Sequence, residues 1–415
     1  MLPADFTTYT RELFGDKRWQ QYLDAFNSPT PVSIRINPFK RCDLSHLPIS
    51  APVPWCRDSF YLTERPDFTL DPLLHAGAYY VQEAASMFLD RVIAQHCPDS
   101  FFANNAAALD LCAAPGGKST LLRAALPERV LLMSNEPDRR RANILMENIQ
   151  KQGHPNVIVT NNLPKDYAKA GLMFDLILTD VPCSGEGMFR KDKGTISEWS
   201  LQNVIKCATL QRSIVEDIWP CLKAGGILVY STCTFNSHED EENVRWIAEE
   251  LGAEMLSVDC ENDWNITSSL LPDWQAPVYR FIPGITRGEG LFMAVLRKST
   301  DNTGRNMVTD RRKALSKMRI ISDGKPVGTQ KGKNMIPAHA EALLTTLPHD
   351  KYPRVELSQN EALRYLHHET IVLPQETPRG FVIVTYRALP LGFVKNIGNR
   401  ANNLYPQEWK IRKMI

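Results

Sequence analysis

Two cysteines and a glycine-containing loop are the residues of this sequence whose types and spacing first suggest chemistry. Cys183 lies in Asp180-Val-Pro-Cys-Ser-Gly-Glu-Gly187, and Cys233 lies in Tyr230-Ser-Thr-Cys-Thr234. The loop Cys112-Ala-Ala-Pro-Gly-Gly-Lys118 precedes both. A cysteine acts as a nucleophile when its thiol is ionised. The three motifs therefore suggest a cofactor loop followed by two functional thiols.

Addition of a thiol to a pyrimidine is a reaction that needs such cysteines. C5 of cytosine is a poor nucleophile, but a thiolate that adds to C6 makes the ring enamine-like, so that C5 can attack a methyl donor. A buried cysteine and a structural aspartate are the plainer interpretation of the Asp180 to Cys183 motif taken alone. Two thiols at one ligand-facing edge are not needed for packing, so the pair favours catalysis.

The loop Cys112–Lys118 indicates which ligand precedes the thiols. Gly117-Lys118-Ser119 fits the end of a triphosphate-binding loop, but Cys112 stands where that pattern needs its first glycine. Gly116 and Gly117 still let the backbone approach a ligand closely. Glu136 follows Gly117 by 19 residues, the spacing at which a carboxylate reaches ribose hydroxyls. A nucleoside without phosphates, as in S-adenosylmethionine, fits better than NAD, and a glycine turn with a surface acid is the alternative.

Alternating strands and helices must position these motifs. The apolar runs Ala106–Leu111, Phe174–Thr179 and Ile227–Ser231 lead into the three motifs, which we expect at the carboxyl ends of parallel strands. Further strands are predicted at Arg129–Ser134, Asn156–Thr160 and Gly290–Leu296, and helices at Ser119–Leu126, Asp138–Gln152, Leu201–Leu222 and His238–Leu251. The sequence therefore predicts an α/β fold with a doubly wound sheet.

The 415 residues are too many for one typical core, and the pattern divides them into four parts. Residues 1–75 mix helical segments at Asp5–Phe14 and Trp19–Phe26 with a strand at Val32–Ile36, which predicts a small N-terminal α+β module. Residues 76–298 hold the sheet, and a helix-like stretch from Leu73 through Val92 leads into its first strand. Residues 299–345 are expected to form a basic linker region. Residues 346–415, with β-like runs at Thr370–Leu373 and Gly380–Tyr386, are expected to form a β-rich domain.

Composition excludes several classes of protein. No run of eighteen apolar residues occurs, and the N-terminus lacks the charged and apolar regions of a secretory signal, so we expect no membrane span and a cytoplasmic protein. Nine cysteines, an odd number without a C-x-x-C pair, argue against a disulfide framework and a structural zinc site. We therefore expect no metal.

The net charge of +1 conceals an asymmetry between the two ends of the chain. From Ser299 to Ile415 there are 19 Lys and Arg residues against 10 Asp and Glu residues. Aromatic residues are interleaved with them, among them Tyr386, Phe393, Tyr405 and Trp409. This combination indicates a surface that binds a polyanion such as RNA, and an ordinary solvated surface is the alternative.

The motifs carry a resemblance to a known family. Leu109-Asp-Leu-Cys-Ala-Ala-Pro-Gly-Gly-Lys118, Asp180-Val-Pro-Cys-Ser-Gly185 and Tyr230-Ser-Thr-Cys-Thr234 resemble the signatures of RNA 5-methylcytosine methyltransferases of the Nop2/Sun family. Glu186–Asp192 and Gly392–Asn403 resemble the bacterial branch that modifies 16S ribosomal RNA, the RsmF type. The resemblance covers nearly the whole chain. It implies a Rossmann-like class I methyltransferase sheet and a PUA-like C-terminal domain that binds RNA.

The resemblance also implies roles for single residues. Asp180 would lie beside the cofactor and the target base, Cys233 would be the nucleophile, and Cys183 would assist release of the methylated product. S-adenosylmethionine would be held by the loop and one acid: Cys112, Ala113, Ala114, Pro115, Gly116, Gly117, Lys118 and Glu136, together with Asp180.

One position departs from the family pattern. Where the family often has an acid after the strand that ends near Thr160, this chain has Leu163. An amide both donates and accepts hydrogen bonds, so Asn161 or Asn162 could contact the adenine end of the cofactor instead. We assign this contact to Asn162.

The expected function is transfer of a methyl group from S-adenosylmethionine to C5 of a cytidine in RNA, with 16S ribosomal RNA or the small ribosomal subunit as partner and a monomer as the active form. A transfer RNA is an alternative substrate. A DNA cytosine methyltransferase would use the Pro-Cys thiol and leave Cys233 without a role. A non-catalytic RNA-binding assembly factor would not need both thiols with Asp180 and Glu136.

Overall fold

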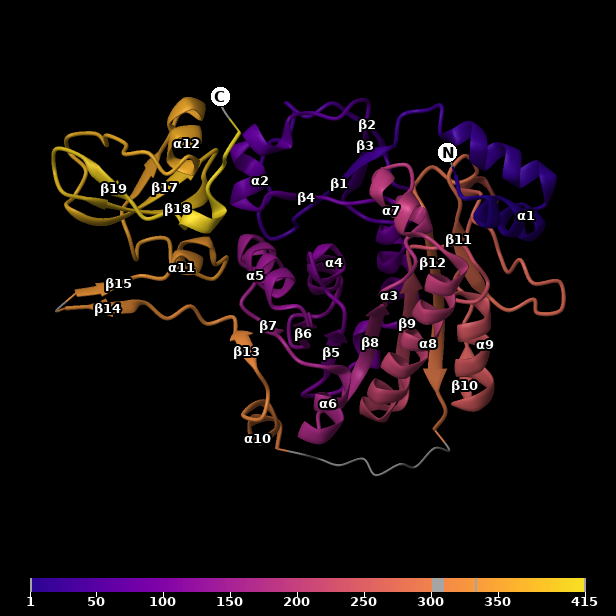
Figure 1. The fold of residues 1–415 in the computed structure, drawn as a ribbon. Helices are drawn as coiled ribbons and strands as arrows, with labels where there is room; N and C mark the ends of the chain where they lie inside the picture. The colour runs from indigo at the N-terminus through magenta and orange to yellow at the C-terminus, as the bar shows by residue number, and fades with distance from the viewer. Residues whose placement is uncertain (1, 301–309, 333, 414–415) are drawn as a thin grey trace.

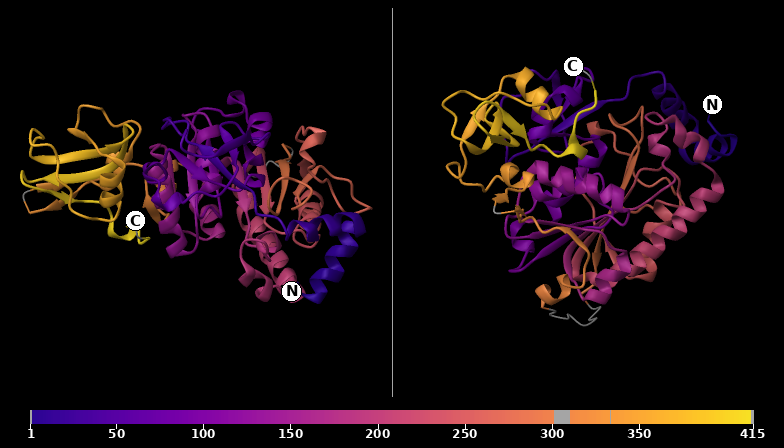
Figure 2. Two further views of the ribbon diagram at one scale, coloured as in Figure 1. Left: turned by 90° about the horizontal axis from the view of Figure 1, so that it is seen from above. Right: turned by 60° about the vertical axis from the view of Figure 1, so that its left-hand side comes forward.

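The computed structural model describes residues 2–300, 310–332 and 334–413. A central sheet with helices on both faces makes up the largest layer (Figure 1). The N-terminal sheet lies along the top of this layer, and the C-terminal domain lies at its left-hand side. Figure 2 shows from above that the C-terminal domain and the N-terminal helix lie at opposite ends of the molecule.

The central sheet runs in the order β10-β12-β9-β8-β5-β6-β7-β13, with β11 paired to β12. The five strands β5 to β9 are parallel, whereas β10 to β13 pair antiparallel at the two sides. Their bounds are β5 (Ala107–Asp110), β6 (Leu131–Asn135), β7 (Val157–Thr160), β8 (Phe174–Asp180), β9 (Leu222–Thr232), β10 (Ala253–Met255), β11 (Val278–Phe281), β12 (Leu291–Lys298) and β13 (Ile320–Ser322). The predicted α/β fold with a Rossmann-like sheet is confirmed.

The sheet is apolar on both faces because both are covered by helices. Along β8, Leu176 and Leu178 pack in the core of α3 (Leu89–His96), α4 (Gly117–Ala125) and α5 (Arg139–Gln152). Ile177, between them, packs on the other face with α6 (Pro164–Ala170), α8 (Leu201–Ile218) and α9 (Glu241–Glu250). Successive side chains of a strand point to opposite faces, so a strand buried on both sides reads as a continuous apolar run.

The N-terminal module contains a kinked helix and a four-stranded sheet. The two predicted helical segments are the two halves of α1 (Ala4–Ala25), which are separated at Gly15 by a non-helical backbone with a φ of 72°. The sheet has the order β2-β3-β1-β4, with bounds β1 (Val32–Ile36), β2 (Ile49–Pro52), β3 (Ser59–Leu62) and β4 (Tyr79–Val81). A short helix, α2 (Pro72–Ala76), precedes β4.

The helix predicted from Leu73 through Val92 is wrong in its middle part. Tyr79–Val81 forms β4 and pairs antiparallel with β1, so that Ile34 lies opposite Val81. A 3₁₀ turn, η2 (Ala85–Phe88), follows before α3 begins at Leu89. Aromatic and β-branched residues suit a pleated strand, and pairing with a distant strand outweighs the local helical spacing.

The C-terminal domain is β-rich, as the sequence predicts. Its sheet has the order β16-β17-β18-β19, and α11 (His339–Leu343) and α12 (Gln359–Leu366) accompany it. The strand bounds are β16 (Arg354–Glu356), β17 (Gly380–Tyr386), β18 (Leu389–Asn396) and β19 (Ala401–Asn403). The strand expected at Thr370–Leu373 is wrong, because Ile371 makes only an isolated bridge to Ala401.

Part of the segment assigned to a basic linker packs on the central sheet. After residues 301–309, which lie outside the described residues, α10 (Arg311–Leu315) places Ala314 in the core, and Met318 is buried with it. β13 then pairs with β7 at the edge of the sheet, and β14 (Thr329–Lys331) and β15 (Asn334–Ile336) form a hairpin. Within the described ranges, no helix is long and apolar enough to cross a membrane.

Arg280 on β11 joins three elements in the interior. Its guanidinium, which is fully buried, forms ion pairs with Asp240 at 3.1 Å and with Glu241 at 2.6 Å, at the start of α9. Thr232, at the end of β9, donates a hydrogen bond of 2.6 Å to the Asp240 carboxylate. This cluster therefore fixes the end of β9 relative to α9 and β11.

Replacing Arg280 should destabilise the fold strongly. The substitution Arg280→Met leaves two buried carboxylates without their cation, which costs about 3–5 kcal/mol. Chemical denaturation measures this loss. Arg297→Met is the matched control, since the Arg297 ion pair with Glu254 is exposed and its loss should hardly move the midpoint. Equal midpoints for the two variants would contradict the importance of the buried cluster.

Candidate active site

The two thiols of the sequence motifs meet at the carboxyl ends of β8 and β9. These strands are parallel neighbours, with Asp180 opposite Ser231, so the loops that follow them lie side by side. The sulfur atoms of Cys183 and Cys233 are 3.1 Å apart, and both cysteines are free and half-buried. The hydrogen bond to Cys233 and burial raise the pKa of Cys183 well above its usual value. Cys183 therefore keeps its proton.

The loops after β8 and β9 are joined by hydrogen bonds. The Gly187 N–H donates to the Cys233 carbonyl at 2.9 Å, and the hydroxyls of Ser184 and Thr234 lie 2.9 Å apart. A Cβ added at Gly187 would lie 2.9 Å from the same Cys233 carbonyl oxygen, so the close approach of the two backbones requires glycine. The position of Cys233 thus depends on the neighbouring loop.

Two buried carboxylates complete the connection between the loops. Glu186 accepts from the backbone N–H groups of Phe235 at 2.7 Å and Asn236 at 3.0 Å. Glu239 accepts from the Ser184 N–H at 3.0 Å and from the side-chain amide of Gln211 at 2.7 Å. Each acid therefore lies in one loop and binds backbone groups of the other.

Neither acid was singled out from the sequence as a site residue. Glu186 lies within the quoted motif Ser-Gly-Glu-Gly187, so its place between two glycines was the available signal. Glu239 lies where the sequence predicts the start of a helix, and the helix α9 begins only at Glu241. Nothing local distinguishes it from a helical surface acid.

An aromatic cluster covers these loops from the N-terminal side. Phe6 and Tyr22 of α1 pack with Phe189, Trp199 and Phe235. The Trp199 indole, which follows α7 (Lys193–Glu198), donates to the Glu186 carboxylate at 2.9 Å. The N-terminal helix therefore supports the loops after β8 and β9 directly.

The glycine loop lies next to the thiols. Its chain leaves β5 at Asp110, passes Gly116 with a φ of 119°, and enters α4 at Gly117. The Lys118 ammonium forms an ion pair of 2.8 Å with Asp180. Burial alone would lower the pKa of Lys118, but Asp180 outweighs burial and the pKa is raised. The loop and the end of β8 are thus held together by a charged contact.

Two acids lie beneath and beside this loop. Asp110 is fully buried, accepts from the Ser119 hydroxyl at 2.6 Å, and has a pKa that burial raises to about 7. Its Oδ1 has no hydrogen-bond partner among the described residues. Glu136, at the end of β6, lies 3.6 Å from Arg141, which donates to the Ala114 carbonyl at 2.9 Å.

The structure places Asn161 and Asn162 differently from each other. The Asn161 amide donates to the carbonyls of Glu136 at 2.8 Å and Pro137 at 2.7 Å. The Asn162 amide donates to the Arg319 carbonyl at 3.1 Å and accepts from the Arg319 N–H at 3.0 Å. Its side chain therefore holds the segment that leads into β13. Leu163 stays 48% exposed beside a pocket of about 700 Å³ that Pro137 and Arg319 also line.

Most of the predicted site residues are brought together. The loop Cys112–Lys118, Glu136, Asp180 and the two cysteines all lie at the carboxyl edge of the parallel strands. Within the described part of the chain, no group of three or more His, Cys, Asp or Glu residues could hold a metal ion.

Three family models match the chain. One described as 16S rRNA methyltransferase RsmB/F matches residues 102–297. One described as the N-terminal domain of 16S rRNA methyltransferase RsmF matches residues 2–84, and one described as the methyltransferase RsmF PUA domain matches residues 352–411. Together they cover the central sheet apart from β13, and most of both flanking units.

Curated relatives match almost the whole chain. The ribosomal RNA small subunit methyltransferase F of Salmonella agona (strain SL483) is 30% identical over 98% of this chain and 96% of that protein. The protein of the same name from Enterobacter sp. (strain 638) is 29% identical over 98% of this chain and 95% of that protein.

Solved structures share the fold. A methyltransferase homolog protein from Pyrococcus horikoshii matches with a TM-score of 0.59 and 27% identity, over 70% of this chain and 93% of that chain. NSun6 from Pyrococcus horikoshii, solved with SFG, matches with a TM-score of 0.60 and 19% identity, over 71% of this chain and 98% of that chain. At this identity the second likeness concerns the fold alone.

Glu239 should make the stability of the loops depend on pH. Burial raises its pKa from 4.5 to about 7, so the folded protein binds this proton more tightly than the unfolded chain does. The resulting stabilisation is fully present below pH 4.5 and is lost as the pH rises through about 7. The loss amounts to about 3 kcal/mol.

Glu239→Gln should remove this dependence, since the amide does not titrate. Chemical denaturation of both proteins between pH 4.5 and 8 measures the difference. Glu254→Gln is the control, because the Glu254 side chain is exposed. Parallel stability curves for the wild type and Glu239→Gln would refute the titration of this group.

Proposed function

This chain belongs to the 16S rRNA methyltransferase RsmB/F family, and we propose that it methylates C5 of a cytidine in 16S ribosomal RNA through a covalent adduct with Cys233. The observation that carries the proposal is the contact of 3.1 Å between the Cys183 and Cys233 sulfurs at the ends of neighbouring parallel strands. A methyltransferase that only positions an RNA base beside its donor needs neither thiol. Two thiols in contact suit a reaction in which one adds to the base and the other assists its release.

The cofactor is S-adenosylmethionine, and the residues beside the loop fit it. The Asp110 Oδ1 atom, buried beneath the loop, lacks a partner among the described residues and can accept a hydrogen bond. Glu136 stands at the end of β6, where a carboxylate accepts from both ribose hydroxyls. Pro137 and the exposed Leu163 offer apolar surface for the adenine, and Asn162 fixes the wall of this pocket through Arg319. The backbone of Cys112–Lys118 approaches the rest of the ligand.

The two thiols have different roles in the reaction at the cytosine base. The Cys233 thiolate adds to C6 of cytosine, which forms an S–C6 bond and moves electron density to C5. Bound S-adenosylmethionine supplies the methyl group that C5 accepts. Solvent water then takes the C5 proton, the electron pair of the C5–H bond restores the C5–C6 double bond, and the S–C6 bond breaks as the Cys233 thiolate departs. Cys183, which keeps its proton beside the Cys233 sulfur, assists this elimination by donating a hydrogen bond to the departing thiolate.

Asp180 can contact the target base while it is paired with Lys118 of the glycine loop. Its carboxylate is 32% exposed and is held by Lys118, so it has a fixed position and free acceptor capacity. Cytosine carries an exocyclic amino group that can donate to this carboxylate, whereas uracil carries a carbonyl there. Asp180 thus favours cytosine over uracil at the same place.

Substitution of Cys233 and substitution of Cys183 should block the reaction at different steps. Cys233→Ala should abolish methylation because no adduct forms, whereas Cys183→Ala should accumulate a covalent protein–RNA complex because elimination stalls. Denaturing gels with labelled RNA separate these results. Cys260→Ala, at an exposed cysteine, should behave as the wild type. Accumulation of the complex by Cys233→Ala and not by Cys183→Ala would reverse the assignment.

Glu136 should determine the affinity for the cofactor. Charge-assisted hydrogen bonds contribute roughly 1.5–3 kcal/mol, so Glu136→Ala should weaken binding of S-adenosylmethionine by about tenfold or more. Calorimetry with the purified protein measures the dissociation constant. Glu128→Ala, at an exposed acid before the same strand, is the control. An unchanged affinity in Glu136→Ala would remove Glu136 from the cofactor site.

A further inference from the structure

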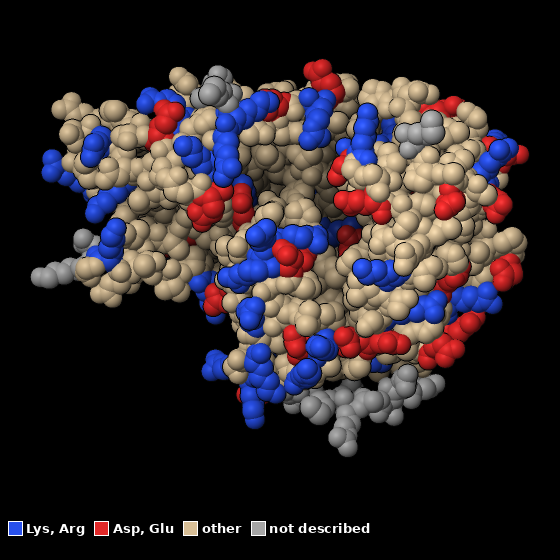
Figure 3. Space-filling model, in the orientation of Figure 1, with Lys and Arg blue, Asp and Glu red and all other residues tan. Residues whose placement is uncertain are grey.

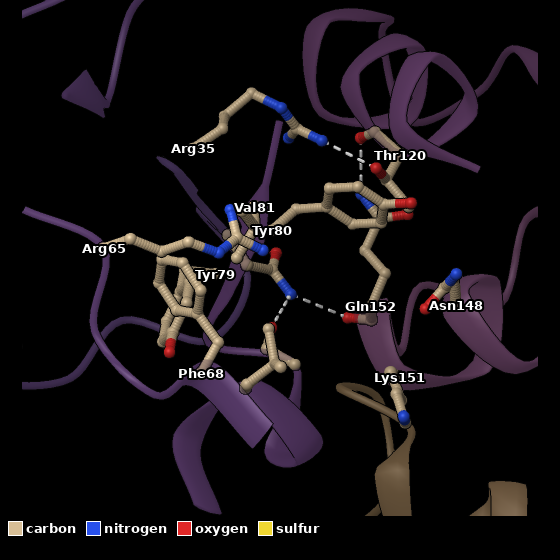
Figure 4. Close-up of a pocket in the computed structure, with 13 residues that line it drawn as sticks. Arg35, Arg65, Phe68, Tyr79, Tyr80, Val81, Thr120, Asn148, Lys151 and Gln152 are labelled. Carbon is tan, nitrogen blue, oxygen red and sulfur yellow. Dashed lines mark hydrogen bonds between the residues drawn. The ribbon is translucent and has the colours of Figure 1, made fainter. Parts of the chain in front are cut away.

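A second pocket lies where the N-terminal sheet meets the helices of the catalytic sheet. It has a volume of about 290 Å³, and the residues that line it come from β1, β4, α4 and α5 and from the segment between β3 and α2 (Figure 4). We call it the junction pocket. None of the proposed cofactor residues lines it, although Thr120 lies only two residues after the cofactor loop. It is thus a separate cavity behind the cofactor loop.

The junction pocket nevertheless adjoins that loop. A Cβ added at Gly117 would lie 3.3 Å from the Tyr80 ring. The Arg35 guanidinium donates to the Thr120 hydroxyl at 2.6 Å and to the Gly117 carbonyl at 3.3 Å. Gly117 is followed by Lys118, which pairs with Asp180. The pocket and the thiols therefore flank the same end of α4.

The two arginines that line the pocket lack acidic partners among the described residues, whereas Lys151, which also lines it, forms an ion pair of 2.5 Å with Glu147. Arg35 is only 4% exposed, and its hydrogen bonds go to neutral groups, namely Gln82, Thr120 and Gly117. Arg65, at the exposed rim, lies over the Phe68 ring at 5.4 Å. Neither arginine forms an ion pair within the part of the chain that the structure describes. A buried guanidinium without a carboxylate is stabilised by an anion, and a phosphate fits its geometry.

The remaining lining suits a nucleobase. Phe68, Tyr79 and Tyr80 supply aromatic surface, and bases of unpaired RNA stack on such rings and on arginine planes. Gln152 donates from Nε2 to the Thr120 carbonyl at 2.6 Å, while its buried Oε1 has no partner among the described residues. Cations, aromatic rings and amides together are a set that recognises a nucleotide.

The pocket also lies close to the C-terminal domain. Lys413 pairs with Asp67 at 2.5 Å, and the Lys151 ammonium lies 5.2 Å from the centre of the Trp409 ring. Figure 3 shows a hollow in the region of α2 and β4, with Lys and Arg side chains on its rim. RNA held by the PUA-type domain would pass this hollow before it reaches the thiols.

We propose that the junction pocket binds a second, unpaired nucleotide of the substrate RNA, outside the reacting cytidine. This proposal rests on the function proposed above. Arg35 and Arg65 face the phosphate, and the aromatic side chains face the base. Holding one nucleotide here and another at Cys233 fixes which cytidine of the RNA reaches the thiols.

The test measures binding of an unmodified 16S rRNA transcript to the full-length protein by fluorescence anisotropy across a salt series. Arg65→Ala and Tyr80→Leu are the test variants, and Arg41→Ala is the matched control, since Arg41 pairs with Asp58 in the same module and does not line the pocket. Arg65→Ala should weaken RNA binding by about threefold or more and reduce the salt slope by about 1. Arg41→Ala should change neither, and calorimetry should give the wild-type affinity for S-adenosylmethionine in Arg65→Ala.

Photocrosslinking gives a second readout that does not depend on catalysis. A transcript that contains 4-thiouridine, bound to Cys233→Ala, should crosslink to the peptide that carries Tyr80, and mass spectrometry identifies it. Unchanged RNA binding in both test variants together with no crosslink there would overturn the proposal. The proposal would also be overturned if the test variants lost affinity for S-adenosylmethionine and not for RNA. Tight binding of free cytidine monophosphate in the pocket, without displacement by RNA, would overturn it as well. Failure of the proposed function would instead appear as RNA binding and crosslinking without methylation by the wild type.

Discussion

The structure depends on the connection that Glu186 and Glu239 make between the loops after β8 and β9. Loops at the end of a parallel sheet have backbone N–H groups that no strand can pair, and burial makes each unpaired group costly. Here carboxylates accept from these groups in place of main-chain carbonyls. Because each acid belongs to one loop and binds the other, the two sulfurs cannot be placed independently. The strand order brings the loops together, and the acids fix them.

The sequence predicted the parts of the molecule whose signal is local. The strands β5, β8 and β9 are apolar runs buried on both faces, so their positions and the motifs at their ends follow from the residues themselves. The strand β4 was missed because its partner, β1, lies more than forty residues away. The same holds for β13, whose three residues pair with β7 and carry an exposed Ile320. Short edge strands have too little pattern to be recognised before their partners are known.

In the candidate site, too, residues with a local sequence signal could be predicted and residues that depend on distant contacts could not. The cysteines, the glycine loop and Glu136 could be named because residue type and spacing suggest their chemistry. The Asn162 amide was assigned to the adenine end of the cofactor, yet it is paired with the backbone of Arg319, a residue of the segment expected to be a linker. That contact depends on where a distant part of the chain returns to the sheet. The buried ion pairs of Arg280 likewise join residues that no local pattern relates.

The packing of α1 against the catalytic loops has a consequence for synthesis on the ribosome. Tyr9 contacts Ser237 across 228 residues, and Phe6 and Tyr22 share a cluster with Phe235. The helix α1 therefore cannot reach its native surroundings until the chain has been synthesised as far as Ser237. In the meantime its aromatic side chains have no native partner to cover them, and long-range contacts of this kind expose nascent chains to misfolding and aggregation. The residues of α1 thus depend on chaperones for longer than residues whose partners lie nearby in the chain.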